Sequence, residues 1–542
     1  MKQNILLSKT QILFLYIGFS VVYVLGLLVP LMQNDSAQHA SMAMRMALNN
    51  DFLNLYKGEN PYLDKPHMHF WLSAISMKLF GINHIAYRIP ALLCIVLGAF
   101  STKKLADLLY PKNYIGDLAA LIFLSAQTII LSAHDVRTDA VLTGFVIFGI
   151  WQFTKFIKTQ SWLSAALAGL GAAVAFSSKG LMPVVIIGFS VFSYLLYSRE
   201  WWRFFNLKLL ISAFIFFVGI SPVLYAYHHQ FGEEGIRFIL FGQSVDRLTA
   251  TGFEKTSPDY FFFFHTLLWA FLPFSLLFYL GVFARSKFFI QNKFKKIEGK
   301  EFLTLGGFWL VMLVFSTSQF KLPHYLNGLM AVLAVLTASY LQELFLNQDK
   351  KKIKILWLVQ LVVITASVVG VILLIIAFTG LYNPILLFVT VLGFVFLFLN
   401  IIRKDSLFTK YALVSLWFAV AVNLFLNTQF YPVLTQFQGG LKLAEYVNKN
   451  NIDKENIYML SGNESWAFDF YTKKNTPRVT ENQLKKGDIA LVYDDELKNF
   501  KRKYSILRTE KNFRITRLSL KFLNPKKRAE QLSETYLVKI ED

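Results

Sequence analysis

The chain has 542 residues, of which 55% are hydrophobic and only 16% are charged, and its mean hydropathy is +0.45. This composition is typical of polytopic membrane proteins and excludes a single soluble core. A net charge of +21 would indicate nucleic acid binding in a soluble protein, but here the basic residues lie between apolar segments, so we expect no nucleic acid partner. The single cysteine, Cys94, lies in an apolar run and excludes a disulfide framework.

Apolar runs of about 17 to 25 residues recur from residue 11 to about residue 428, and each can cross a hydrocarbon layer of about 30 Å as a helix. The first run has no small-residue cleavage site, so we expect a retained span and not a signal peptide. We predict about thirteen transmembrane helices, near residues 11–32, 86–107, 116–133, 139–157, 162–178, 180–198, 208–229, 260–284, 302–318, 325–345, 355–378, 383–401 and 410–427.

Lysine and arginine gather in alternate loops between these helices. The basic loops are at residues 103–112, 155–158, 199–208, 285–300, 349–354 and 403–404. This excess is typical of cytoplasmic loops, and it also favours contact with anionic membrane lipids. With the N-terminus inside, an odd number of helices places all six basic loops inside and the C-terminus outside.

The outer side then receives residues 33–85, 134–138, 230–259 and 320–325. The first of these segments contains SAQHASMAMRMALNN, whose spacing of Ala, Met and Leu predicts an amphipathic helix at the membrane interface. A second interfacial helix is predicted over HFWLSAISMKLFG, with Phe70 and Trp71 at the level of the lipid headgroups.

After residue 430 the chain becomes rich in Lys, Asn, Glu and Asp, with only short apolar runs. We therefore divide it into a transmembrane domain at 1–430 and a small extracytoplasmic α/β domain at 431–542. Helices are expected at 440–450 and 464–474, and strands at 456–460, 488–495, 504–510, 513–520 and 535–540. The predicted fold class is an all-α polytopic membrane protein with this C-terminal α/β domain.

Acidic and basic residues collect on the predicted outer ends of the helices. Taken singly, each has an ordinary structural interpretation: Asp35 and Asp139 as helix caps, Asp64 with Lys65 as an exposed ion pair, and the rest as interfacial anchors. Taken together they indicate a site for a phosphorylated, partly lipidic ligand. The residues are Asp35, Asp64, Lys65, Asp139, Arg247, Lys321 and Tyr325.

The order of these motifs resembles a known family. Asp35 follows the first span, and DKP at 64–66, TDAVL at 138–142, SKG at 178–180 and KLPHY at 321–325 come after it. This order resembles the lipid A aminoarabinose transferase branch of the protein O-mannosyltransferase-like glycosyltransferases. The resemblance implies the GT-C fold and transfer of a sugar from a polyprenyl phosphate to an acceptor on the periplasmic or lumenal side.

The resemblance also implies roles for single residues. Asp35 becomes the candidate catalytic acid-base and Asp139 a second catalytic acid. Asp64 and Lys65 match a Glu-Lys-Pro motif, in which Lys65 holds the donor phosphate and Asp64 orients it. Arg247 and Tyr325 match further phosphate ligands, and Lys321 lies beside them.

Two positions depart from the family pattern and bear on metal binding. Ser36 stands where the family commonly has Glu, and Ser244 stands where related transferases place a histidine three residues before the arginine. No cofactor is therefore assigned. His67 and His69 are left as alternative ligands for a divalent metal, against the simpler interpretation of amphipathic packing.

The predicted function is a membrane glycosyltransferase that uses a polyprenyl-phosphate-linked sugar and acts on a lipid A-like glycolipid or a protein. The predicted location is the bacterial inner membrane, with the active site and the C-terminal domain in the periplasm. Two alternatives stay open: a transporter of polyprenyl-linked lipids, and an oligosaccharide ligase or polymerase of similar architecture. The sequence identifies neither the sugar nor the acceptor. No glycine-rich nucleotide loop occurs, which favours a lipid-linked donor.

Overall fold

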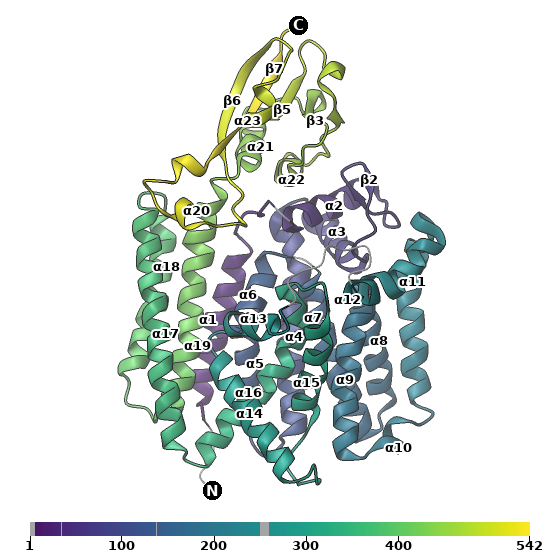
Figure 1. Cartoon of the computed structure of the whole chain (residues 1–542), viewed down its shortest axis with the longest axis vertical. Helices are drawn as coiled ribbons and strands as arrows, with labels where there is room; N and C mark the ends of the chain where they lie inside the picture. The colour runs from purple at the N-terminus through teal and green to yellow at the C-terminus, as the bar shows by residue number, and fades with distance from the viewer. Residues whose placement is uncertain (1–5, 34, 137, 250–258) are drawn as a thin grey trace.

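The computed structural model describes residues 6–33, 35–136, 138–249 and 259–542, which form a long helical bundle with a small sheet domain at one end (Figure 1). Within these residues, nine helices are long and apolar enough to cross a membrane. They are α1 (Lys9–Gly26), α4 (His84–Leu109), α7 (Asp139–Thr159), α9 (Leu181–Ser198), α11 (Leu209–Arg237) with η1 (Phe238–Asp246), η2 (Pro323–Leu329) with α16 (Met330–Leu346), α17 (Lys350–Ala377), α18 (Pro384–Ile402), and α19 (Leu407–Phe425) with η3 (Leu426–Phe430) and α20 (Tyr431–Thr435).

The other predicted spans are also helical, but they are bent, short or less apolar. Helices α5 (Gly116–Ser125) and α6 (Gln127–His134) are long and apolar enough for a span only when taken together, and a bend of 62° separates them. Helix α8 (Trp162–Lys179) packs between α7 and α11, and α15 (Leu303–Thr317) packs on α9. Residues 260–284 form two helices, α13 (Phe262–Ala270) and α14 (Ser275–Gln291), separated by a turn. All thirteen predicted ranges therefore contain a helix.

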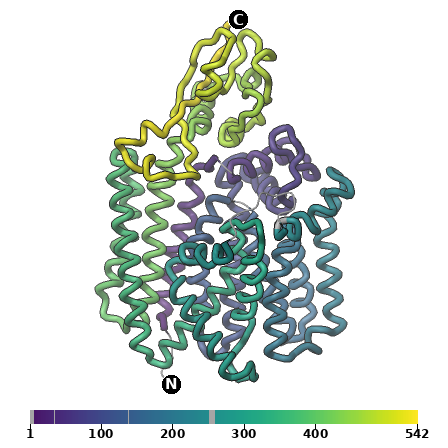
Figure 2. Tube along the Cα trace, in the orientation of Figure 1, coloured from purple at the N-terminus to yellow at the C-terminus, as the bar shows by residue number. Residues whose placement is uncertain are grey.

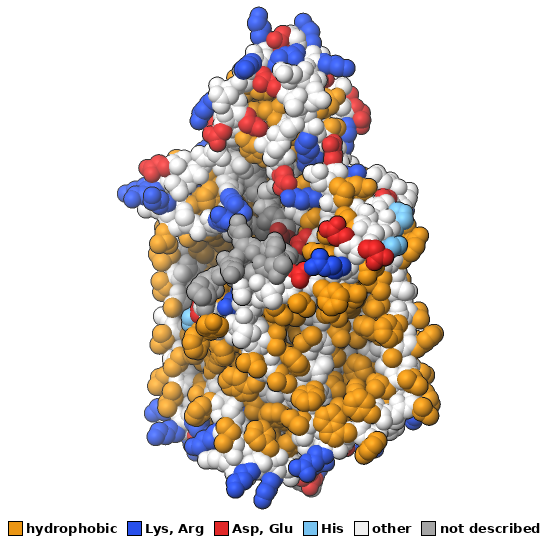
Figure 3. Space-filling model, turned by 45° about the vertical axis from the view of Figure 1, so that its right-hand side comes forward, with side chains coloured by type: hydrophobic (Ala, Val, Ile, Leu, Met, Phe, Trp, Pro, Cys, Tyr) orange, Lys and Arg blue, Asp and Glu red, His pale blue; other side chains and the backbone are white. Residues whose placement is uncertain are grey.

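The two ends of the chain lie at opposite ends of the bundle, and segments distant in sequence lie side by side (Figures 1 and 2). The first helix, α1, packs against α19, the last long helix of the bundle. On the face drawn in Figure 3, a broad hydrophobic band covers the helices, and Lys and Arg lie at the end opposite the sheet domain and on the sheet domain itself. Charged side chains on this face therefore lie mostly outside the band.

Above the bundle, on the side of the sheet domain, lie α2 (Asp35–Asn49), α3 (Met68–Phe80) and a small hairpin of β1 (Tyr56–Lys57) and β2 (Asn60–Pro61) (Figure 1). A helix is present at each of the two ranges predicted for interfacial helices. Helix α2 does not lie freely at a membrane surface, however, because most of its residues are buried between α3 and the C-terminal domain. Its apolar spacing therefore reflects packing against protein.

The C-terminal region forms a five-stranded sheet in the order β4-β3-β5-β7-β6. Strand β3 is parallel to β4 and β5, whereas β7 is antiparallel to β5 and β6, with Ala490 opposite Val538. The elements are α21 (Gly439–Lys449), β3 (Ile457–Leu460), α22 (Trp466–Thr472), β4 (Arg478–Val479), β5 (Ile489–Tyr493), α23 (Asp494–Leu497), β6 (Tyr504–Asn512), α24 (Leu520–Leu523) and β7 (Ser533–Ile540). The predicted small α/β domain is confirmed, while the boundary at residue 430 stays a prediction.

The strand predicted at 513–520 is wrong. Phe513 stacks on Phe522 with ring centroids 3.9 Å apart, and the Phe513 amide donates to the carbonyl of Phe437 at 2.8 Å. Ile515 and Phe522 are buried in a cluster with Phe378 at the end of α17. The alternating apolar residues of this segment therefore dock the domain onto the bundle and do not extend the sheet.

Candidate active site

A buried ion pair joins two helix ends on the side of the bundle that carries the sheet domain. Asp139 is the first residue of α7, and Lys179 is the last residue of α8. The Lys179 Nζ lies 2.8 Å from the Asp139 Oδ1, and both side chains are buried. A carboxylate in the first turn and an ammonium in the last turn complement the helix dipoles. The Lys179 Nζ also lies 4.8 Å from the centre of the ring of Tyr325, which belongs to η2.

Gly180 lets η1 approach this pair closely. Its φ of +70° suits glycine, and a Cβ atom there would lie 2.9 Å from the carbonyl oxygen of Ile239. Beside this contact lies a narrow, mostly apolar cavity, whose polar lining residues are Lys179, Gln243, Ser244, Ser318 and Tyr325. The predicted site residues Asp139 and Tyr325 are far apart in the sequence, but both contact Lys179 at this cavity.

Asp64 and Lys65 are connected to the same cavity through η1. The Lys65 Nζ lies 2.9 Å from the Asp64 Oδ2, with the Lys65 side chain largely buried and that of Asp64 more exposed. The Gln243 side-chain amide donates a hydrogen bond to the backbone carbonyl of Asp64. Gln243 thus links the wall of the cavity to the segment that carries Lys65.

The other predicted phosphate ligands lie on neighbouring segments. Arg247 begins the short helix α12 (Arg247–Thr249), immediately after η1; its side chain lies outside the described part of the structure. Lys321 is buried, and its Nζ donates to the carbonyl of Asp259 at 2.9 Å and lies 5.4 Å from the centre of the Tyr260 ring. Lys321 therefore contacts the segment before α13.

Asp35 lines a second cavity, where the bundle meets the C-terminal domain. It occupies the first turn of α2, is exposed, and lines a cavity of about 380 Å³. The walls of this cavity come from both parts of the molecule and are mostly polar. They include Asp35 and Gln38 of α2, and Glu464, Asn512 and Arg514 of the C-terminal domain.

His67 and His69 are both buried, and each has its own hydrogen-bond partner. The His67 Nε2 lies 2.9 Å from the carbonyl of Leu53, and the His69 Nε2 lies 3.1 Å from the Tyr87 hydroxyl. Burial lowers the pKa of each imidazole to about 4, so both are neutral at pH 7. Among the residues that the structure describes, no group of three or more His, Cys, Asp or Glu side chains is placed to hold a metal. These two histidines therefore do not fit a metal site, and we derive no step through a metal.

Two residues of the narrow cavity, Lys179 and Gln243, were not among the predicted site residues. The SKG motif contains Lys179, and a lysine that ends an otherwise apolar helix was a usable signal. Gln243 had no such signal, because an isolated glutamine near a helix end is ordinary. Its importance comes only from its contact with Asp64.

The comparisons with known proteins support the predicted resemblance. Residues 64–226 match the family model described as dolichyl-phosphate-mannose-protein mannosyltransferase. This range contains the DKP, TDAVL and SKG motifs. It also contains Asp64, Lys65, Asp139 and Lys179.

Two similar curated proteins are named undecaprenyl phosphate-alpha-4-amino-4-deoxy-L-arabinose arabinosyl transferase. The one from Edwardsiella ictaluri is 25% identical over 64% of this chain and 62% of its own length. The one from Wigglesworthia glossinidia brevipalpis is 24% identical over 96% of this chain and 98% of its own length. An uncharacterized protein of Aquifex aeolicus is 24% identical over 83% of each chain.

Among solved structures, the chain is similar to ArnT from Cupriavidus metallidurans bound to undecaprenyl phosphate, with a TM-score of 0.73 and 16% identity over 98% of both chains. The apo state of the same protein gives a TM-score of 0.69 over 97% of both chains. The likeness extends over the bundle and the C-terminal domain together. The chain therefore has the GT-C fold, and its predicted resemblance to the protein O-mannosyltransferase-like glycosyltransferases, in particular to the aminoarabinose transferases, is confirmed.

Proposed function

We propose that this protein is a multi-pass membrane glycosyltransferase that moves a sugar from a polyprenyl phosphate donor to an acceptor on the periplasmic side of a bacterial inner membrane. The observation that carries this proposal is the cluster of Asp139, Lys179 and Tyr325, which Gln243 links to the segment of Asp64 and Lys65. The chain also has the fold of a protein solved with undecaprenyl phosphate. The names of the curated relatives support the same donor class.

Lys65 is the proposed donor-phosphate ligand. Its ammonium already faces a carboxylate, and the largely buried side chain is poorly hydrated, which strengthens a contact with a phosphate. Tyr325, Lys321 and Arg247 are the further ligands that the resemblance implies. Of these three, Tyr325 lines the narrow cavity, and Arg247 follows η1 directly in the sequence.

In the proposed reaction, an acceptor oxygen attacks the anomeric carbon of the donor sugar in line with the departing phosphate. The new bond forms between the acceptor oxygen and the anomeric carbon, while the bond from that carbon to the phosphate oxygen breaks and its electron pair leaves with the polyprenyl phosphate. A hydroxyl acceptor transfers its proton to the Asp35 carboxylate. Fixed cations beside the phosphate stabilise the charge that grows on it, and such contacts are worth several kcal/mol in a dry site.

The proposal is tested by transfer of a radiolabelled sugar from a polyprenyl phosphate donor, using the purified protein in detergent. Lys65→Ala should cost about 2 to 4 kcal/mol of transition-state stabilisation because it removes a charge-assisted phosphate contact. The matched control is Lys57→Ala, which removes a lysine of the same outer segment that pairs with Glu464 at 2.8 Å. Equal transfer by the Lys65→Ala and wild-type proteins would contradict the phosphate assignment.

The proposed sidedness needs a separate experiment. Asp495 in the C-terminal domain and Glu298 in a basic loop both have almost fully exposed side chains. A cysteine at position 495 should react with a membrane-impermeant thiol reagent in cells with a permeable outer layer, and one at position 298 should not. The native Cys94 is buried and gives a low background. Labelling at both positions, or only at 298, would reject the periplasmic placement.

A further inference from the structure

The C-terminal domain forms several hydrogen bonds with the short segment that leads from α1 to Asp35. The Gln33 side chain reaches the start of α22, where its Oε1 accepts from the Ala467 amide at 2.9 Å and its Nε2 donates to the Glu464 carbonyl at 3.2 Å. The Gln33 backbone amide donates to the Oε1 of Gln438. We call Gln33 and Gln438 the glutamine clamp.

Gln438 completes the clamp from the other side. It precedes α21 and is buried, and its Nε2 donates to the carbonyl of Leu31 at 3.0 Å. The Leu31 amide in turn donates to the Tyr471 hydroxyl of α22 at 2.9 Å. A single amide side chain therefore uses both its donor and its acceptor on the backbone of residues 31 and 33. A buried amide that loses these partners is left with unsatisfied polar atoms, so the geometry is strongly specified.

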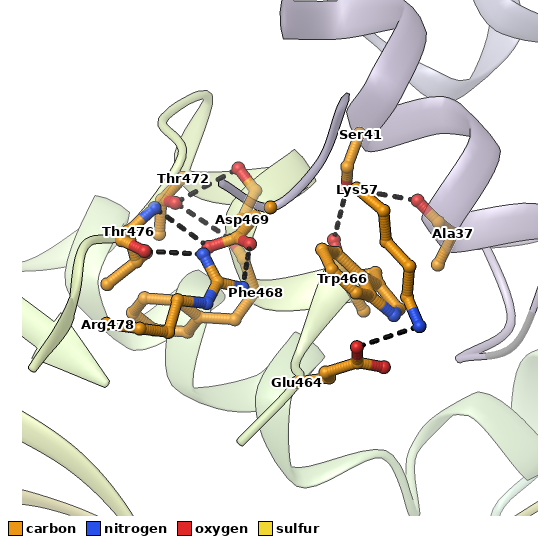
Figure 4. Close-up of polar contacts among 12 residues, drawn as sticks. Ala37, Ser41, Lys57, Glu464, Trp466, Phe468, Asp469, Thr472, Thr476 and Arg478 are labelled. Carbon is orange, nitrogen blue, oxygen red and sulfur yellow. Dashed lines mark hydrogen bonds and ion pairs between the residues drawn. The ribbon is translucent and has the colours of Figure 1, made fainter. Parts of the chain in front are cut away.

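Polar contacts hold helix α22, to which the clamp is bonded, within the C-terminal domain, and Figure 4 shows these contacts. The buried Asp469 lies 2.7 Å from the Arg478 Nη2 and accepts from the Thr476 amide at 3.0 Å. The guanidinium of Arg478 lies 5.3 Å from the centre of the Trp466 ring. The start of α22 is therefore fixed within the C-terminal domain.

The same helix also holds the body of α2. The Ser41 hydroxyl donates to the Trp466 carbonyl at 2.9 Å, as Figure 4 shows beside the ion pair of Lys57 and Glu464. Asp35 thus lies between two points that the C-terminal domain fixes, residue 33 before it and residue 41 after it. The domain also supplies most of the polar wall around Asp35.

From this geometry we propose that Gln33 and Gln438 are positioning residues for Asp35, and that the C-terminal domain completes the catalytic site by holding the start of α2. This inference rests on the proposed function, in which Asp35 accepts the acceptor's proton. A shift of about 1 Å in a catalytic group costs on the order of 100-fold in rate. Hydrogen bonds that hold the backbone two residues before Asp35 are therefore expected to affect the transfer rate.

The first test is single-turnover transfer with the donor in excess. Gln33→Ala and Gln438→Ala should each lower the transfer rate about 10- to 100-fold, while the KM for donor and for acceptor changes less than twofold. Lys57→Ala is the matched control, because it breaks an ion pair of the same interface without touching residues 31–33; its rate should stay within twofold of wild type. Equal losses in all three variants would mean that the interface acts only through stability.

A double-mutant cycle separates an effect through Asp35 from a general one. In an Asp35→Asn background the base is absent, so Gln33→Ala should cost no further activity, within about twofold. If Gln33→Ala costs the same factor in both backgrounds, the clamp does not act through Asp35 and the proposal is overturned.

An activity-independent readout keeps the clamp testable if the proposed function fails. A spin label at an Asp35→Cys site, in a Cys94→Ser background, should give a more mobile spectrum after Gln33→Ala and an unchanged one after Lys57→Ala. An unchanged spectrum in both would overturn the positioning role whatever the reaction. Absence of any transfer by the wild-type protein would instead reject the proposed function, and the spectra would still decide the clamp.

Discussion

The two predicted catalytic carboxylates, Asp35 and Asp139, start two helices in very different surroundings. Asp139 is 2% exposed and lies 2.8 Å from the Lys179 ammonium at the wall of a narrow cavity. Asp35 is exposed and lines a wider polar cavity between the bundle and the C-terminal domain. The same residue type at the same place in a helix is therefore enclosed in one case and accessible in the other.

This difference separates their proposed roles. A buried carboxylate that holds a lysine can accept a proton only by giving up its ion pair, which leaves a desolvated ammonium without its partner. Asp139 is therefore better suited to hold Lys179 beside Tyr325 than to act as a base. Asp35 can meet an incoming acceptor, so proton transfer is assigned to it.

The largest effect is expected at Asp35. Asp35→Asn keeps the size of the side chain but removes the base, so the single-turnover rate should fall roughly 10²- to 10⁴-fold with a hydroxyl acceptor. A phosphate acceptor is already ionised near pH 7, and the loss should then be much milder. Transfer by the purified variant to each acceptor class measures this. An unchanged rate with a demonstrated hydroxyl acceptor would remove Asp35 from catalysis.

Removing one partner of the buried Asp139–Lys179 pair should lower the free energy of unfolding. Lys179→Ala leaves the Asp139 carboxylate buried without its lysine and should cost about 3 to 5 kcal/mol of folding free energy. The double variant Lys179→Met with Asp139→Leu should regain most of this stability because it buries no charge. Thermal unfolding in detergent compares the three proteins. A Lys179→Ala variant as stable as wild type would show that the pair contributes nothing to the fold.

The segment that carries Lys65 should be sensitive to acid through His67. Because burial lowers its pKa from 6.5 to about 4, the folded state favours the neutral imidazole. The contribution of the neutral His67 to folding stability is fully present above pH 6.5 and is lost progressively as the pH falls from 6.5 to 4; at pH 5 the loss is about 2 kcal/mol. His67→Gln keeps a donor for the Leu53 carbonyl but cannot be protonated. Unfolding of this variant should therefore depend less on pH between 7 and 4 than unfolding of the wild type.

The smallest effect is expected at Tyr325. Tyr325→Phe keeps the ring beneath Lys179 and removes only the hydroxyl proposed to contact the donor phosphate. The donor KM should rise about fivefold, equivalent to about 1 kcal/mol, with unchanged thermal stability. Steady-state kinetics with varied donor measures it. A drop in stability without a change in KM would place Tyr325 with the structural pair instead.

Most elements of this protein and several residues of its proposed site can be predicted from the amino-acid sequence alone. Length and hydropathy predict the helices at all thirteen ranges, because a segment that crosses lipid must satisfy its own backbone and expose apolar side chains. Motif order pointed to Asp35, Lys65 and Asp139. The prediction of a strand at 513–520 was wrong because alternating apolar residues occur in a segment that packs on the bundle as well as in a sheet.

Which of these residues contact one another depends on the packing of distant segments. Lys179 lies 40 residues from Asp139, and Gln438 lies hundreds of residues from the segment it grips before Asp35. Such contacts depend on the order of helices in the bundle and on the docking of the C-terminal domain. Hydropathy carries no information on either, because lipid-facing and protein-facing apolar residues look alike in sequence. The enclosure of Asp139 and the exposure of Asp35 therefore follow from packing, although both carboxylates begin a helix.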